Sequence, residues 1–142
     1  GTDLVYSGTA AAARQASMLG IPGIALSLAE FREPFLYGGL AYTVAEGLEE
    51  LLRLWSPEVF INVNAPNGPA DRRFAFREAK PCRRTYHDTL KVFDGADGHS
   101  YCFFTDGRVE SVEAEGSDER AVRDGYASVS RVLVYPVAEP AE

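Results

Sequence analysis

The residues most suited to chemistry lie near the start of the sequence, where Ser7-Gly8-Thr9 runs directly into an alanine-rich stretch. The alanines at 10–13 and 16 favour a helix that begins at these three residues. The first N–H groups of a helix lack intrahelical partners and carry the positive end of its dipole, so they attract anions. Gly8 presents no Cβ to a ligand, and the hydroxyl groups of Ser7 and Thr9 add donors. This arrangement could hold a phosphate group without a lysine.

A second interpretation of the same residues stays open. Ser and Thr are preferred N-cap residues, and Gly is common beside them, so Ser-Gly-Thr also describes an ordinary helix start. The local sequence fits both capping and anion binding.

Other residue types with catalytic or metal-binding potential show no supporting pattern. Cys82 and Cys102 lack the spacing of metal ligands, and we expect reduced thiols in a cytosolic protein. His87 and His99 lie near turn signals without a second ligand at useful spacing, so we expect structural or solvent-facing side chains. The sequence predicts no catalytic residue and no metal ligand among these 142 residues.

Charge and composition exclude several classes of protein. A formal net charge of −7 argues against a protein that mainly grips nucleic-acid backbone, because that function requires a basic face. No apolar run reaches the ~18 residues of a membrane span, and no signal peptide is visible. The sequence begins Gly-Thr-Asp, and Met18 is its only methionine, so we expect a piece of a longer cytoplasmic protein.

The elements that must position Ser-Gly-Thr alternate between helix and strand. We expect a helix over 9–19, ended by Gly20, and then an apolar strand over 23–28 that is buried on both faces. A loop, a second helix over 40–55 and a strand that starts at Val59 follow. This alternation indicates an α/β sheet with helical crossovers.

The second half of the sequence is richer in strand patterns. The segment 94–98, Asp-Gly-Ala-Asp-Gly, predicts a hairpin loop between strands at 89–93 and 99–104. Thr105-Asp-Gly-Arg108 predicts another turn. Many aromatic residues occur here without a clear core of their own, so we expect this hairpin to leave its subunit and pack on another chain.

The end of the chain predicts one more helix and one more strand. Ser117 can cap a short helical turn that runs through Arg123 and stops at Gly125. Residues 126–135 are rich in β-branched side chains and predict a strand, and we expect the tail, 136–142, to be frayed.

Three blocks of sequence share a likeness to one known family. The first, residues 1–28, carries Tyr-Ser-Gly-Thr at the start of a small-residue helix and then an Ile-Pro-Gly-Ile-Ala strand. The second is VFINVNAP at 59–66, and the third is SDERAVRDGYASVS at 117–130. In this order they resemble the SurE family of survival-protein nucleotidases and phosphatases, over nearly the whole chain.

The resemblance implies an α/β fold, namely the C-terminal part of a Rossmann-like SurE fold with a strand-rich hairpin extension. We therefore expect one partial domain over 1–142, with an α/β part at 1–70 and a β-rich extension and tail at 71–142. The family's paired aspartates, with the Ser and Asn that complete its metal site, would precede Gly1. Asp3 is a lone carboxylate, which we expect to support loop structure, with contact to the site as the alternative.

The same resemblance implies a phosphomonoesterase that depends on Mg²⁺ or Mn²⁺, acts on nucleoside monophosphates and assembles as a homodimer or tetramer with swapped C-terminal segments. Only Ser7, Gly8 and Thr9 are implied here, as phosphate-binding residues. We expect these 142 residues to supply that helix start and an oligomerisation segment, to bind no metal and to be inactive alone. The alternative is a non-catalytic phosphate-binding or assembly module. No membrane and no nucleic-acid polymer is expected as a partner.

Overall fold

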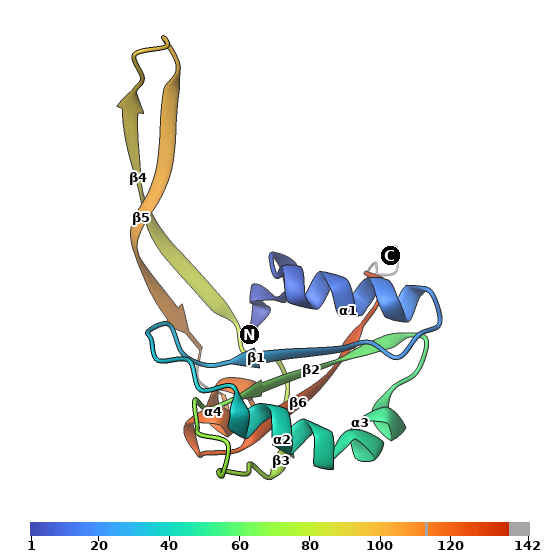
Figure 1. Ribbon diagram of the computed structural model, residues 1–142. Helices are drawn as coiled ribbons and strands as arrows, with labels where there is room; N and C mark the ends of the chain where they lie inside the picture. The colour runs from blue at the N-terminus through green and yellow to red at the C-terminus, as the bar shows by residue number, and fades with distance from the viewer. Residues whose placement is uncertain (113, 137–142) are drawn as a thin grey trace.

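Residues 1–112 and 114–136 are described in a computed structural model of the protein (Figure 1). Its strands are β1 (Ile24–Leu28), β2 (Val59–Ala65), β3 (Phe76–Glu78), β4 (Arg84–Asp94), β5 (Ser100–Ser111) and β6 (Ala127–Leu133). Its helices are a 3-10 helix η1 (Thr2–Val5), α1 (Gly8–Met18), α2 (Gly38–Glu46), α3 (Leu48–Leu54) and α4 (Asp118–Arg123). None of the helices in these described ranges is long and apolar enough to cross a membrane.

The body of the protein is a four-stranded sheet in the order β1-β2-β6-β3. β1 and β2 are parallel and are joined through α2 and α3, whereas β6 runs antiparallel to β2. Figure 1 shows α1 on one face of this sheet and α2 and α3 on the other. The expected α/β class, with a helical crossover between parallel strands, is confirmed.

Each face of the sheet has its own apolar core. Under α1, Ala10 and Ala13 pack against Ala25 and Phe60 of the strands. The opposite face carries the larger cluster, whose buried members are Leu40, Val44, Leu51, Ile61, Val63, Ala65, Phe74, Ala127 and Val129. The alternation of side chains along β2 therefore divides its residues between two cores.

The helix α1 and the strand after it lie in close contact. α1 ends as predicted, because Gly20 takes a positive φ of 76°. A Cβ on Gly23 would lie 2.0 Å from the carbonyl oxygen of Ala13, so only glycine permits this approach. The expectation that this strand is buried on both faces is wrong, because β1 is an edge strand of the sheet and Leu26 is exposed.

The helix expected over 40–55 is two helices, which meet at Gly47. The ring of Phe76 lies against this residue, and a Cβ on Gly47 would lie 2.3 Å from Phe76 Cε2. Close packing of the β3 side chain thus coincides with the break between α2 and α3, and periodicity alone does not reveal that contact.

The predicted hairpin exists but is longer than expected, since β4 and β5 pair from Arg84 with Ser111 to Asp94 with Ser100. Figure 1 shows it as a long arm that leaves the body of the protein. The turn predicted at 105–108 is wrong, because these residues lie within β5. The register shifts between His87 and Thr89, so a β-bulge accommodates the Asp-Gly dipeptide inside the ladder.

The end of the described chain returns to the sheet. Ser117 caps α4 by accepting a hydrogen bond from Arg120 N, as predicted, and β6 inserts between β2 and β3. Among the described residues of the β-rich extension expected over 71–142, the hairpin leaves the sheet, whereas β3 and β6 belong to it. The tail expected to be frayed lies outside the described residues beyond Pro136.

Candidate functional site

Strand register gathers polar side chains on the α1 face of the sheet. Ser27 of β1 pairs with Asn64 of β2, and Asn64 and Asn62 pair with Ser128 and Ser130 of β6. Directly paired residues project to the same face, so these five side chains form one group. We call it the polar strip. On the same face, α1 covers Ala25 and Phe60, which precede the polar residues along β1 and β2. The polar strip therefore begins near the first turn of α1.

Most members of the polar strip are satisfied by local hydrogen bonds. Ser130 Oγ donates to the carbonyl oxygen of Ala79 at 2.8 Å, and Asn64 Nδ2 donates to Ser128 Oγ at 3.4 Å. Asn62 differs from them, since the residue is only 3% exposed and its Nδ2 has no hydrogen-bond partner among the described residues. Buried amide donors are normally paired, so this side chain needs an explanation.

The helix start predicted to bind phosphate lies beside the polar strip. Ser7 is the N-cap of α1, and its Oγ accepts a hydrogen bond from Ala10 N at 3.1 Å. Gly8 and Thr9 are exposed, and their N–H groups belong to the first turn, where no intrahelical acceptor exists. Capping is therefore present. The capping hydrogen bond uses the N–H group of Ala10, so the N–H groups of Gly8 and Thr9 remain for another acceptor.

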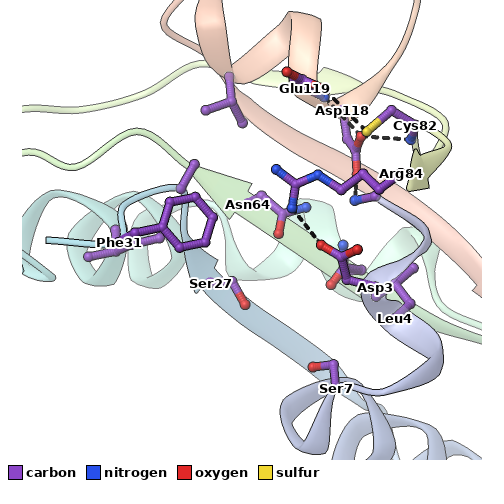
Figure 2. Close-up of a pocket in the computed structure, with 15 residues that line it drawn as sticks. Asp3, Leu4, Ser7, Ser27, Phe31, Asn64, Cys82, Arg84, Asp118 and Glu119 are labelled. Carbon is purple, nitrogen blue, oxygen red and sulfur yellow. Dashed lines mark hydrogen bonds and ion pairs between the residues drawn. The ribbon is translucent and has the colours of Figure 1, made fainter. Parts of the chain in front are cut away.

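A cavity of about 250 Å³ adjoins the helix start and the polar strip. Ser7, Ser27, Asn62 and Asn64 line one part of it. The rest of the lining consists of Gly1, Asp3, Leu4, Leu28, Ala29, Phe31, Cys82, Arg84, Asp118, Glu119 and Val122. Figure 2 shows Phe31 across the cavity from Asp3 and Arg84, with Ser7 and Ser27 on its lower side.

An ion pair closes one wall of this cavity. Arg84 Nη1 donates to Asp3 Oδ2 at 2.5 Å, and Arg84 Nε donates to Ser111 Oγ at 3.3 Å. Burial lowers the pKa of Arg84, but the hydrogen bond and charge of Asp3 outweigh it, so its pKa lies above the usual value. Asp3 thus lines the cavity and, through its ion pair with Arg84, also holds the segment before α1 against the base of the hairpin.

Asp118 anchors a second wall from within α4. Its Oδ1 accepts from Cys82 N and from Glu119 N, each at 2.8 Å, and in residues 1–142 alone its Oδ2 accepts from the nitrogen of Gly1. In residues 1–142 alone, burial raises the pKa of Asp118, but the hydrogen bond and charge of the Gly1 amino group, with the N–H of Cys82, outweigh burial and hold its pKa below the usual value. Burial, together with the charge of Asp118, raises the pKa of the Cys82 thiol to about 11, so this thiol is inert at neutral pH.

The carboxylates around the cavity do not fit a metal site. Asp3 is bound to Arg84, and Asp118 accepts from N–H donors that a cation would have to displace. Glu119 accepts from Cys82 Sγ and Arg123 Nη2. No group of three or more His, Cys, Asp or Glu residues in the described part of the chain could hold a metal ion. A divalent ion of the kind that the family resemblance implies would need ligands from outside these residues.

The structure brings only part of the predicted site together. Ser7 lines the cavity, whereas Gly8 and Thr9 lie outside its lining on the exposed first turn. Sequence reasoning missed Asn62, Asn64 and Arg84. The alternation of Asn with apolar residues in the β2 segment VFINVNA was an available signal, since it predicts one polar face on an otherwise buried strand.

Comparison with known proteins identifies similar chains. A family model described as "Survival protein SurE" matches residues 1–88. The 5'-nucleotidase SurE of Petrotoga mobilis is 33% identical over 136 residues, which cover 95% of this chain and 54% of that protein. The 5'-nucleotidase SurE of Gemmatimonas aurantiaca is 36% identical over 134 residues, which cover 92% of this chain and 53% of that protein.

A solved structure supports the same fold. The crystal structure of the SurE protein from Aquifex aeolicus matches with a TM-score of 0.71 at 24% sequence identity, covering 96% of this chain and 55% of that one. At this identity the likeness shows the fold alone. The chain spans about half the length of the curated relatives it matches.

Replacing Asp118 tests the wall that joins α4 to Cys82. We expect Asp118→Asn to lower the free energy of unfolding by about 2 kcal/mol at pH 7, because charge-assisted hydrogen bonds are weakened in a buried place. The pKa of this carboxyl is lower in the folded state, so its stabilisation is present above its ordinary value of 3.8 and is lost as the pH falls through the folded value.

The measurement is urea unfolding of residues 1–142 and of the variant from pH 7 to pH 2. Asp71→Asn, at an exposed position, serves as the matched control, with an expected change within about 0.5 kcal/mol. A stability difference that stays constant across this pH range would show that the charge of Asp118 contributes nothing.

Proposed function

The chain belongs to the SurE family, and on that premise we propose that it is part of a hydrolase that releases phosphate from nucleoside monophosphates. Its relatives named 5'-nucleotidase SurE support this reaction class. The observation that carries the proposal is the start of α1, where the exposed residues Gly8 and Thr9 follow Ser7, which lines the cavity. This part of the chain faces the phosphate.

The helix start contributes binding and orientation. The N–H groups of Gly8 and Thr9 donate to phosphoryl oxygens, and the hydroxyl of Thr9 adds a third donor. A helix N-terminus contributes about 0.3–2 kcal/mol to such an interaction. Hydrolysis of phosphate monoesters requires some of the largest rate enhancements known, so these donors assist a reaction that they cannot drive alone.

The remaining chemistry comes from outside these 142 residues. A divalent metal ion, Mg²⁺ or Mn²⁺, would need oxygen ligands from the longer protein and would supply polarisation of the phosphoryl group. Ser7 holds the first turn in place through Ala10 N, so Gly8 and Thr9 keep their positions as charge redistributes.

The alternative is a non-catalytic phosphate-binding or assembly module. The ion pair of Asp3 Oδ2 with Arg84 and the N–H donors on Asp118 favour it for the chain alone, because both carboxylates are held in structural contacts. The two readings differ in whether a longer protein contributes the reacting groups.

We also propose that the hairpin of β4 and β5 is an oligomerisation segment. Its two faces both carry exposed apolar side chains: Phe93, Tyr101 and Phe103 on one face, and Leu90, Val92 and Phe104 on the other. Phe104 is 77% exposed. An isolated hairpin with this surface is marginal in water, so a second copy of the chain is the partner that we infer.

Phosphate release tests the proposed reaction. We expect residues 1–142 alone to release no phosphate from a nucleoside monophosphate with Mg²⁺ or Mn²⁺, and the full-length protein to do so. In the full-length protein, Thr9→Ala should lower kcat about tenfold by removing one donor, without changing metal binding. Ser56→Ala, which removes a hydroxyl group just before β2 and outside the cavity lining, is the control and should leave kcat unchanged. Robust metal-dependent turnover by residues 1–142 would mean that the catalytic carboxylates lie within them.

Light scattering tests the role of the hairpin. We expect the protein to be a dimer or tetramer at micromolar concentration, and Phe104→Glu to dissociate it, because a buried charge at an apolar interface is costly. Leu19→Glu, which changes an exposed apolar residue at the end of α1, should leave the assembly intact. A monomeric wild-type protein, or an assembly unaffected by Phe104→Glu, would contradict this role.

A further inference from the structure

We propose that the cavity beside α1 receives the sugar of a nucleoside ligand, and that Asn62 binds one of its hydroxyl groups. This assignment rests on the proposed function, because it names the part of the substrate that lies next to the phosphate. The proposal adds Asn62 of β2 to the site, for which the sequence predicts the start of α1 and no other residues.

The first support is the unpaired amide of Asn62. This residue is 3% exposed, lines the cavity, and has no partner for Nδ2 among the described residues. Its neighbours on the polar strip differ, since Asn64 Nδ2 donates to Ser128 Oγ and Ser130 Oγ donates to Ala79 O. A donor left unpaired in the wall of a cavity indicates an acceptor on a ligand.

The second support is an unpaired acceptor in the same cavity. Asp3 Oδ1 is buried and has no hydrogen-bond partner within the described ranges, although burial and the nearby Asp3 carboxylate raise the pKa of Tyr86. Oδ2 of the same carboxylate is held by Arg84. A hydroxyl group can donate to a carboxylate and also accept from an amide, so it satisfies both kinds of group. Phosphate oxygens only accept, and they repel the carboxylate. The vicinal hydroxyl groups of a ribose therefore fit this wall better than a second phosphate does.

The rest of the cavity suits the remainder of a nucleoside. Its volume of about 250 Å³ is lined by Leu28, Ala29 and Val122 as well as by polar groups. Phe31 lies on the opposite side from Asp3 and is 79% exposed, so a base can stack on it. Ser7 both caps α1 and lines the cavity, so the helix start and the sugar position are contiguous.

The test is a titration of the ¹⁵N-labelled protein with adenosine, a nucleoside that carries no phosphate. We expect saturable shifts of the side-chain amide signals of Asn62, with smaller shifts for Asn64, whose amide already has a partner. 2',3'-Dideoxyadenosine lacks both hydroxyl groups and should bind at least about tenfold more weakly. Unmoved Asn62 signals, or equal affinity for the two nucleosides, would overturn the proposal.

A variant pair separates binding from structure. Asn62→Asp replaces the donor with an acceptor of the same shape and should weaken adenosine binding at least about tenfold. Ser130→Ala, at the position paired with Asn62 in β6 and outside the cavity lining, should bind adenosine like the wild type. Wild-type affinity in Asn62→Asp would overturn the proposal, and the two nucleosides decide the matter on the wild-type protein if that variant does not fold.

The same titration distinguishes this inference from the proposed function. Adenosine reports on the cavity alone, whereas inorganic phosphate reports on the N–H groups of Gly8 and Thr9. Adenosine binding without phosphate binding would overturn the phosphate-facing role and support the sugar position. Phosphate binding without adenosine binding would overturn the sugar position alone.

Discussion

The pairing register of β1, β2 and β6 is the constraint on which the candidate site depends. It aligns Ser27 with Asn64 and places Asn62 opposite Ser130. A slip of one residue in β2 would turn its two asparagines toward the apolar core under α2 and α3 and would bring Ile61 and Val63 to the α1 face. The close contact of Gly23 with Ala13 fixes α1 against this face, so the helix starts where the apolar surface gives way to the polar strip.

Long-range contacts then complete the cavity from segments far apart in the sequence. Arg84, at the base of the hairpin, reaches Asp3 just before α1, and Asp118 of α4 binds the backbone of Cys82. Because Arg84 holds Asp3 Oδ2 and backbone N–H groups hold Asp118, these two carboxylates shape the site and hold its walls. The groups left for a ligand are the N–H groups of the first turn of α1, the amide of Asn62 and the Oδ1 atom of Asp3.

Local patterns in the sequence predicted the elements that carry their own signals. Ser7 and Ser117 as caps, Gly20 as a helix end, and the Asp-Gly-Ala-Asp-Gly loop depend on a few neighbouring residues, and the structure contains all four. The turn predicted at Thr105–Arg108 failed because cross-strand pairing with β4 overrides local turn chemistry. The pair of Asp3 with Arg84 could not be predicted, because the hairpin base and the chain start meet only in the folded sheet.

The central claim is that the start of α1 is a phosphate-binding point, and amide shifts on titration with inorganic phosphate test it most directly. Saturable shifts should be largest at Gly8 and Thr9, and Gly8→Ala should weaken them. A Cβ on Gly8 meets no other atom within 4 Å, so the variant obstructs the ligand without disturbing the fold. Amides of Gly8 and Thr9 that do not respond to phosphate, or wild-type affinity in Gly8→Ala, would contradict the account.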